Sequence, residues 1–142
     1  MVKALIDSNI IMDLLNGVTA ARTECSYYSD IAISAVTWME VAVGSTATEM
    51  VQFETFIRAL GVKVVHTNDV IAYRAAQIRQ NGLKAFPKRN IKLPDAIIGA
   101  TANVEGRIVV TRNPRDFGAN TVRVPYQYDA TTGIVNNVLP PL

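Results

Sequence analysis

Short apolar segments alternate with longer amphipathic segments along the 142-residue chain, and this alternation constrains the fold more than any other feature. Patterns typical of strands cover residues 2–6, 31–34, 62–66, 107–111 and 121–125. Helical patterns cover residues 9–16, 37–44, 48–60, 68–81 and 94–105. Strands that alternate with helices imply a mostly parallel central sheet flanked by helices. We therefore expect an α/β fold with three layers.

Composition narrows the class of protein further. The chain is 49% hydrophobic and has neither a repeat nor a linker-like segment, so we expect a single domain over residues 1–142. Its net charge of +2 gives no indication of a polyanionic partner. Cys25 is the only cysteine, which excludes an intramolecular disulfide and a Cys-rich zinc site. No apolar run reaches the ~20 residues that span a bilayer, and the first apolar segment is too short for a signal peptide. We expect a cytoplasmic protein without membrane contacts.

Four carboxylates stand beside the expected strands, and three of them, Asp7, Glu40 and Asp95, interrupt strongly apolar sequence. Asp7 directly follows the first strand, and Glu40 lies one turn into the helix after the second. Asp95 opens the helix before the fourth strand, and Asp116 follows that strand. Because ligands of parallel sheets bind at the carboxyl ends of the strands, these acids are expected to meet at one edge. Carboxylates that meet repel each other unless a cation neutralises them, and Mg²⁺ and Mn²⁺ prefer oxygen ligands.

Each acid also has a purely structural interpretation. Asp7 is a good helix cap, and Glu40 follows Thr37 at the spacing of a capping box. Asp95 suits the positive end of its helix, and Asp116 suits a turn. The argument for a metal site therefore rests on the joint placement of the four acids.

Other enzyme classes find less support in the sequence. A ribonuclease with paired histidines is excluded because His66 is the only histidine. Glycine-rich phosphate loops and the G-x-S-x-G elbow are absent. A Mg²⁺-dependent phosphatase with Asp7 as nucleophile remains an alternative, although Asn9 stands where such a loop carries its second acid.

Four segments carry a specific resemblance to a known family. They are LIDSN at residues 5–9, ISAVTWME at 33–40, LPDAIIGATA at 93–102 and TRNPRDF at 111–117. With these segments the chain resembles the PIN-domain ribonucleases, in particular the VapC toxins of type II toxin–antitoxin systems. The resemblance spans essentially the whole chain. It implies a three-layer PIN-like fold and a metal-dependent endoribonuclease, a hydrolase that leaves a 5′-phosphate and a 3′-hydroxyl.

The resemblance also implies the residues of the site. The metal-binding and catalytic residues are Asp7, Glu40, Asp95 and Asp116, and the ion is Mg²⁺ or Mn²⁺. Asp7 and Asp95 are the preferred direct ligands with Asp116 completing the site, whereas Glu40 either binds the metal or orients the attacking water. Some PIN domains carry an acid where this chain has an asparagine. We assign this residue, Asn113, a supporting role around the ligands, together with Asn9 and Thr111.

Cations gather before and after the helix that carries Asp95. Candidate contacts to RNA phosphates are Lys84, Lys88, Arg89, Lys92, Arg112 and Arg115. The alternative interpretation is a solvated loop whose charges balance the acids. Phe86, within this group, either stacks on a base or anchors the loop on the core.

The resemblance implies three partners. The first is an RNA substrate, whose identity stays open. The second is a cognate VapB-like antitoxin that covers the acidic cleft. The third is a second copy of the chain in a homodimer, which with antitoxin can form a larger hetero-oligomer. The non-enzymatic alternative is a PIN-like module that binds RNA or protein without cleavage.

Overall fold

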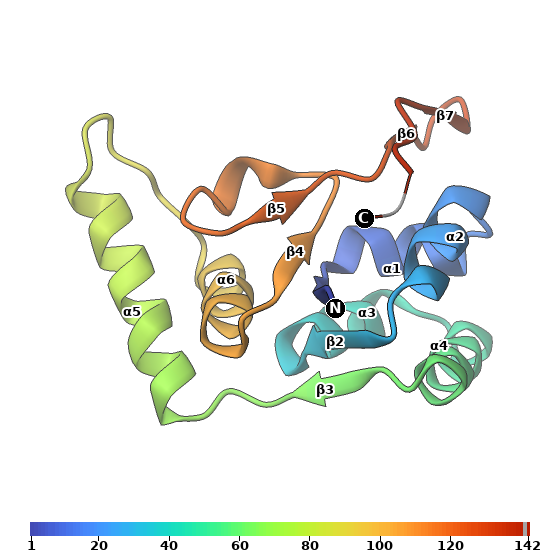
Figure 1. Ribbon diagram of the computed structural model, residues 1–142, viewed down its shortest axis with the longest axis horizontal. Coiled ribbons are helices and arrows are strands. Elements are labelled where there is room, and N and C mark those ends of the chain that lie inside the picture. The colour runs from blue at the N-terminus through green and yellow to red at the C-terminus, as the bar shows by residue number, and fades with distance from the viewer. Residues whose placement is uncertain (141) are drawn as a thin grey trace.

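The computed structural model describes residues 1–140 and 142 and contains a five-stranded parallel sheet with strand order β3-β2-β1-β4-β5 (Figure 1). The strands of this sheet are β1 (Lys3–Ile6), β2 (Asp30–Ser34), β3 (Lys63–Val65), β4 (Ile108–Val110) and β5 (Val122–Arg123). A separate antiparallel hairpin consists of β6 (Gln127–Asp129) and β7 (Ile134–Asn136). The helices are α1 (Ser8–Leu15), α2 (Thr19–Tyr27), α3 (Ala35–Gly44), α4 (Ala47–Leu60), α5 (Asp69–Lys84) and α6 (Leu93–Glu105), with a 3₁₀ turn η1 (Pro114–Asp116) after β4.

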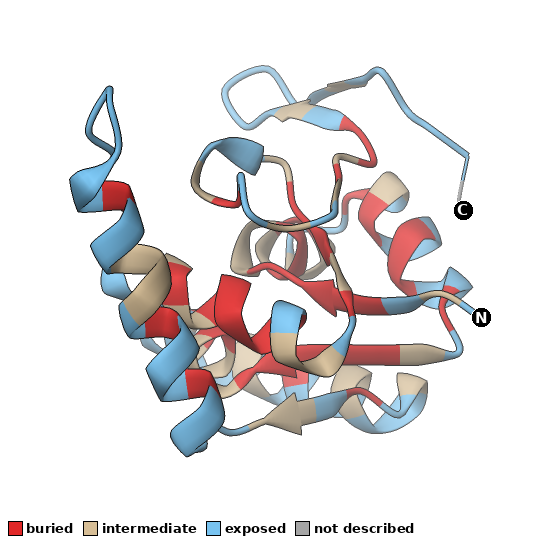
Figure 2. Ribbon diagram, turned by 60° about the vertical axis from the view of Figure 1, so that its left-hand side comes forward, coloured by how far each residue is buried: buried red, intermediate tan, exposed pale blue. Residues whose placement is uncertain are grey.

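The sheet lies between two layers of helices, and its buried side chains alternate between the faces. In β1, Ala4 and Ile6 belong to the core formed with α1, α2 and α4, whereas Leu5 belongs to the core formed with α6. Helix α5 packs outside α6, away from the sheet (Figure 1). Figure 2 shows the buried residues concentrated in the strands and in the helix faces that meet them. The expected three-layer α/β fold is confirmed.

Two helix boundaries differ from the sequence-based expectation. Helix α3 begins at Ala35, because the hydroxyl of Ser34 caps it by accepting a hydrogen bond from Val36 N at 3.1 Å. Thr37 therefore lies inside the helix, and the capping box that was expected between Thr37 and Glu40 is wrong. The carboxylate of Glu40 is thus not required at a helix end.

Helix α5 continues through Gly82 to Lys84, three residues beyond the helical pattern that the sequence shows over residues 68–81. Gly82 is buried, and a Cβ atom there would lie 2.7 Å from the carbonyl oxygen of Arg89. The absent side chain lets the connection after α5 fold back against the helix. Close packing therefore explains this glycine better than helix termination.

The sequence patterns missed α2 and the β6–β7 hairpin. Helix α2 has few apolar residues, and part of its stability comes from a buried ion pair between Glu24 and Arg123, with N–O distances of 2.7 and 3.0 Å. Hydrophobic periodicity does not reveal such a pair. Among the described helices, none is long and apolar enough to cross a membrane.

Candidate metal centre

The carboxyl end of β1 places Asp7 beside the end of β4. Ile6 pairs with Val110 in the parallel ladder, and the backbone N–H of Asp7 donates to the Val110 carbonyl at 3.0 Å. Asp7 and Thr111 are therefore neighbours at the same edge of the sheet. This is the edge at which ligands of parallel sheets bind.

Asp7 is both a helix cap and the most enclosed of the four acids. It is 6% exposed, and its Oδ1 accepts a hydrogen bond from Ser8 N at 2.8 Å, which starts α1. Its Oδ2 accepts from Thr111 Oγ1 at 2.8 Å and from Asn9 Nδ2 at 3.4 Å. Burial raises the pKa of Asp7, and the Thr111 hydroxyl is the strongest opposing influence. The capping role and a ligand role are thus compatible.

Thr111 is the centre of the hydrogen bonds around Asp7. Its buried Oγ1 accepts from Asn9 Nδ2 at 3.1 Å and from the backbone N–H of Asn113 at 3.0 Å. The side-chain oxygen of Asn9 in turn accepts from the backbone N–H of Arg112 at 3.2 Å. Asn9 and Thr111 thus hold the Asp7 carboxylate in place, whereas Asn113 contributes through its backbone.

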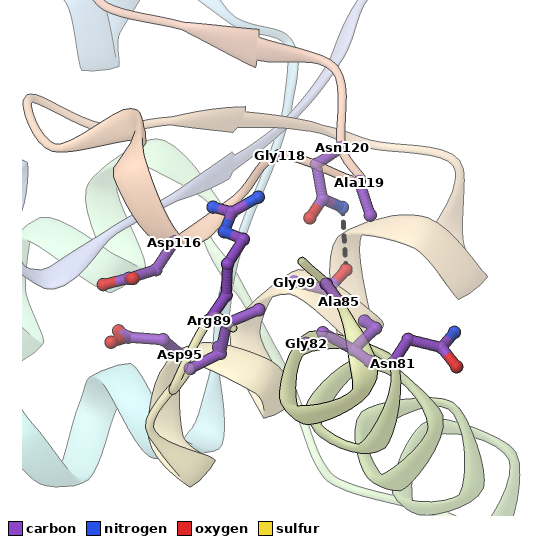
Figure 3. A pocket seen from close by; sticks show the side chains of 12 residues that line it. Asn81, Gly82, Ala85, Arg89, Asp95, Gly99, Asp116, Gly118, Ala119 and Asn120 are labelled. Atoms are coloured by element: carbon purple, nitrogen blue, oxygen red, sulfur yellow. Dashed lines mark hydrogen bonds between the residues drawn. The ribbon is translucent and has the colours of Figure 1, made fainter. Parts of the chain in front are cut away.

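The remaining acids reach the same edge from α3, α6 and η1. Lost hydration raises the pKa of Glu40, and the negative charges of Asp7 and Asp95 raise it further. Burial raises the pKa of half-buried Asp95, with further contributions from Asp116 and Asp7. Figure 3 shows the carboxyl groups of Asp95 and Asp116 side by side and pointing in the same direction. The four acids therefore form one repulsive cluster.

The cluster is not a closed metal cage. Within residues 1–140 and 142, no three His, Cys, Asp or Glu side chains converge closely enough to form a metal site as they stand. The available donors are all carboxylate oxygens, and Mg²⁺ typically takes one or two carboxylates while it keeps several waters. This donor chemistry fits a hard divalent cation.

The structure separates the six expected phosphate contacts into two groups. Five are exposed, namely Lys84, Lys88, Arg89, Lys92 and Arg115, whereas Arg112 is only partly exposed. The guanidinium of Arg89 donates to the backbone carbonyl of Arg115 and lies against Gly118. Arg112 is held by Asp13, so its guanidinium is already engaged. Phe86 is fully exposed, and the expectation that it anchors the loop on the core is wrong.

Sequence reasoning missed a buried network that supports the site. Asp13 is 2% exposed, and its carboxylate accepts from Arg112 Nε at 2.6 Å and from Arg112 Nη2 at 3.0 Å. The hydroxyl of Tyr126 donates to the same carboxylate at 2.7 Å, and both burial and this bond raise the pKa of Tyr126. The network ties α1 to the residue that follows Thr111. Its signal was an acid inside the apolar segment 10–15, where a charge requires a partner.

Comparisons with known proteins agree with this architecture. The family model of the PIN domain matches residues 4–120, and the chain belongs to the PIN-domain family. Members of this nuclease family generally use divalent metal ions. No curated protein sequence matches the chain significantly.

Several solved structures are similar to the chain. A chain of a toxin–antitoxin complex from Klebsiella pneumoniae is 37% identical, with a TM-score of 0.69 over 88% of this chain and 99% of that chain. The DNA-bound VapBC complex from Salmonella typhimurium contains a chain that is 26% identical, with a TM-score of 0.73 over 87% and 98%. FitAcB from Neisseria gonorrhoeae is 25% identical, with a TM-score of 0.67 over 86% and 97%. These matches confirm the resemblance to the toxin branch.

Proposed function

We propose that this chain is a Mg²⁺- or Mn²⁺-dependent endoribonuclease that acts as the toxin of a type II toxin–antitoxin pair in the cytoplasm. The observation that carries the proposal is the meeting of Asp7, Glu40, Asp95 and Asp116 at the carboxyl edge of a parallel sheet. The raised pKa values of Asp7, Glu40 and Asp95 support it, because perturbed carboxyl groups that share a site are typical of functional centres.

The residues of the cluster have distinct roles in this proposal. Asp7, Asp95 and Asp116 would hold the metal, and Asn9 and Thr111 keep Asp7 in position. A bound divalent ion lowers the pKa of water and neutralises charge on a phosphodiester. Glu40, which is exposed on α3, either completes the ligand set or accepts a proton from the attacking water.

The RNA would approach over the connection between α5 and α6. Lys84, Lys88 and Lys92 are exposed there and suit contacts to phosphates, which supply affinity without reading the sequence. Fully exposed Phe86 suits stacking on an unpaired base. Arg115 is also exposed, and it directly precedes Asp116 in the sequence.

The protein partners belong to the same proposal. Similar chains come from toxin–antitoxin complexes, which supports a VapB-like antitoxin as the cognate partner. A cationic antitoxin side chain that entered the acidic cluster would compete with the metal for the carboxylates. We also propose a homodimer, with larger hetero-oligomers when antitoxin is bound.

The substitution Asp7→Asn tests the nuclease proposal. It removes one negative charge and one metal ligand with little change of shape, so cleavage of RNA in Mg²⁺ or Mn²⁺ should be lost. Asp69→Asn, at the exposed start of α5, removes the same charge far from the cluster and serves as the control. Products of the active protein should carry 5′-phosphates and 3′-hydroxyls. Full cleavage by Asp7→Asn, or by the wild type in EDTA, would contradict the proposal.

A binding module without cleavage is the second candidate, and the open arrangement of the acids favours it. In that case RNA would be retained at unchanged length across a Mn²⁺ titration. The phosphatase alternative predicts an aspartyl phosphate on Asp7. It is disfavoured because Asn9 stands where such a loop carries its second acid.

A further inference from the structure

A groove follows the seam between α5 and α6 and begins at two of the acids. Its first part is a cavity of about 290 Å³, with Asp95 and Asp116 on one side and Asn81 and Asn120 on the other (Figure 3). A second hollow of about 300 Å³ shares Asn81 and Asn120 with the first and extends toward Arg74. The two hollows share the lining residues Ile78, Asn81, Ala119 and Asn120 and therefore adjoin each other, and together we name them the α5–α6 groove.

Side-chain amides are the main polar groups of the groove away from the acids. They are Gln77, Asn81, Asn103 and Asn120. An amide offers both a donor and an acceptor, which is the combination that reads the edge of a nucleobase. Asn120 is held in a fixed orientation, because its Nδ2 donates to the Gly99 carbonyl at 2.9 Å. In the part of the chain that the structure describes, no protein hydrogen bond occupies the side chains of Gln77 and Asn81.

Glycines let the walls of the groove approach each other closely. A Cβ atom on Gly99 would lie 2.9 Å from Asn120 Oδ1, so a side chain there would displace the amide. A Cβ atom on Gly118 would lie 2.7 Å from Arg89 Nη1 and would displace the guanidinium. Both glycines thus keep polar groups at the rim of the cavity.

Arg89 provides the positive charge between the acids and the amides. Figure 3 shows its side chain rising across the cavity between Asp95 and the end of α5. Its guanidinium has five N–H donors, and its bond to the Arg115 carbonyl leaves others for an anion. A phosphate next to the acids would therefore meet a cation, whereas the group attached to that phosphate would meet the amides.

We propose that the α5–α6 groove binds the unpaired RNA nucleotides on one side of the scissile phosphate, with Arg89 on a phosphate and Asn81 and Asn120 on base edges. This inference rests on the proposed nuclease function and adds a base-reading site to it. RNA is read mainly through unpaired bases, whose edges are free for hydrogen bonding. Because the groove starts at Asp95 and Asp116, a nucleotide in it stays connected to the reacting phosphate.

The test measures binding of a fluorescent single-stranded RNA hexanucleotide in Mg²⁺. All proteins carry Asp7→Asn so that the RNA stays intact. Ala119→Trp fills the groove, and Asn81→Ala removes one amide from an exposed helix position without a hydrogen bond to lose. Ala47→Trp, at the exposed start of α4, is the matched control. A ribose-phosphate chain of the same length without bases separates phosphate contacts from base contacts.

Ala119→Trp should weaken hexanucleotide binding by about tenfold or more, the size of one lost base contact. Asn81→Ala should weaken it by about two- to tenfold and leave binding of the abasic chain unchanged. The Asn81 and Asn120 side-chain amide signals should shift in NMR spectra when the hexanucleotide is added. Ala47→Trp should behave as its parent.

Two results would overturn the inference. One is equal hexanucleotide affinity for the Ala119→Trp and Ala47→Trp proteins with unmoved amide signals, which would place the RNA elsewhere. The other is equal affinity for the abasic chain and the hexanucleotide, which would mean that the RNA is bound through its phosphates only. If the wild-type protein binds RNA in the groove but does not cleave it in Mn²⁺, the nuclease proposal is refuted and the inference about RNA binding in the groove still holds. Normal cleavage by the Ala119→Trp protein with Asp7 restored would refute RNA binding in the groove but not the nuclease proposal.

Discussion

The bond between Thr111 and Asp7 allows a quantitative test of how the chain prepares its acidic cluster. Thr111→Val keeps the size and branching of the buried side chain but removes its hydroxyl. The Asp7 carboxylate then loses the hydrogen bond of 2.8 Å, and Asn9 and the backbone of Asn113 lose their acceptor. The donors of Asn9 and Asn113 are partly accessible to water, so the lost bond to Asp7 dominates the effect.

A hydrogen bond to a charged group contributes about 1.5–3 kcal/mol, so the metal-free variant should lose that much free energy of unfolding at pH 7. Removing the partner of a metal-binding group typically lowers metal affinity by about 10–100-fold, and we expect a loss of Mn²⁺ affinity in this range. The pKa of Asp7 should rise further, because the strongest influence that lowers it is removed. The pH at which Mn²⁺ binding reaches half its maximum should therefore move upward.

The pH dependence of stability has a definite sign. Because burial raises the pKa of Asp7 above its usual value of 3.8, the folded protein keeps this proton at pH values where the unfolded chain has released it. Asp7 therefore makes the metal-free protein less stable as pH rises from about 3.8 through the folded-state pKa. Thr111→Val should extend this decline to higher pH and match the wild type more closely in acid.

Urea unfolding in EDTA and titration with Mn²⁺ measure the two effects. Thr55→Val is the control, because the exposed Thr55 hydroxyl donates only to the Val51 carbonyl within α4, at 2.8 Å. The reasoning is refuted if Thr111→Val and Thr55→Val bind Mn²⁺ with the same affinity and unfold at the same urea concentration.

Three further predictions concern the cluster, its support and the exposed loop. Asp7→Asn should raise the Tm of the metal-free protein at pH 7, since it relieves a buried charge, and should abolish the further rise that Mn²⁺ gives the wild type; a lower Tm in EDTA would contradict this. Arg112→Ala should lower the free energy of unfolding in urea by an amount near the lower end of about 3–5 kcal/mol, because it leaves the buried carboxylate of Asp13 without its cation. The lower end applies because the Arg112 side chain is itself 25% exposed. A loss below about 1 kcal/mol would mean that this ion pair does not stabilise the fold. Phe86→Ala should weaken binding of single-stranded RNA by about tenfold and leave the Tm unchanged, and unchanged RNA affinity would exclude base stacking at this position.

Local sequence pattern was enough to predict the layers of this fold and the positions of two acids. Short β-branched strands and amphipathic helices predicted the parallel sheet, because each pattern reports which side of an element is buried. Asp7 directly follows β1 and Asp116 lies in the short turn η1 after β4, so their place at the carboxyl edge follows from the order of elements alone.

Long-range pairing decided what the sequence patterns left open. Asp13 with Arg112 and Glu24 with Arg123 each join residues 99 positions apart, and no local periodicity records such a partner. The fold of α5 and its connection likewise decided that Arg89 crosses the cavity while Phe86 faces solvent. The sequence alone thus determined the fold class and the acidic edge, since both depend on short-range order. Only the tertiary structure determined which charges are neutralised inside the protein and which remain for a ligand, because charge pairing depends on distance in space.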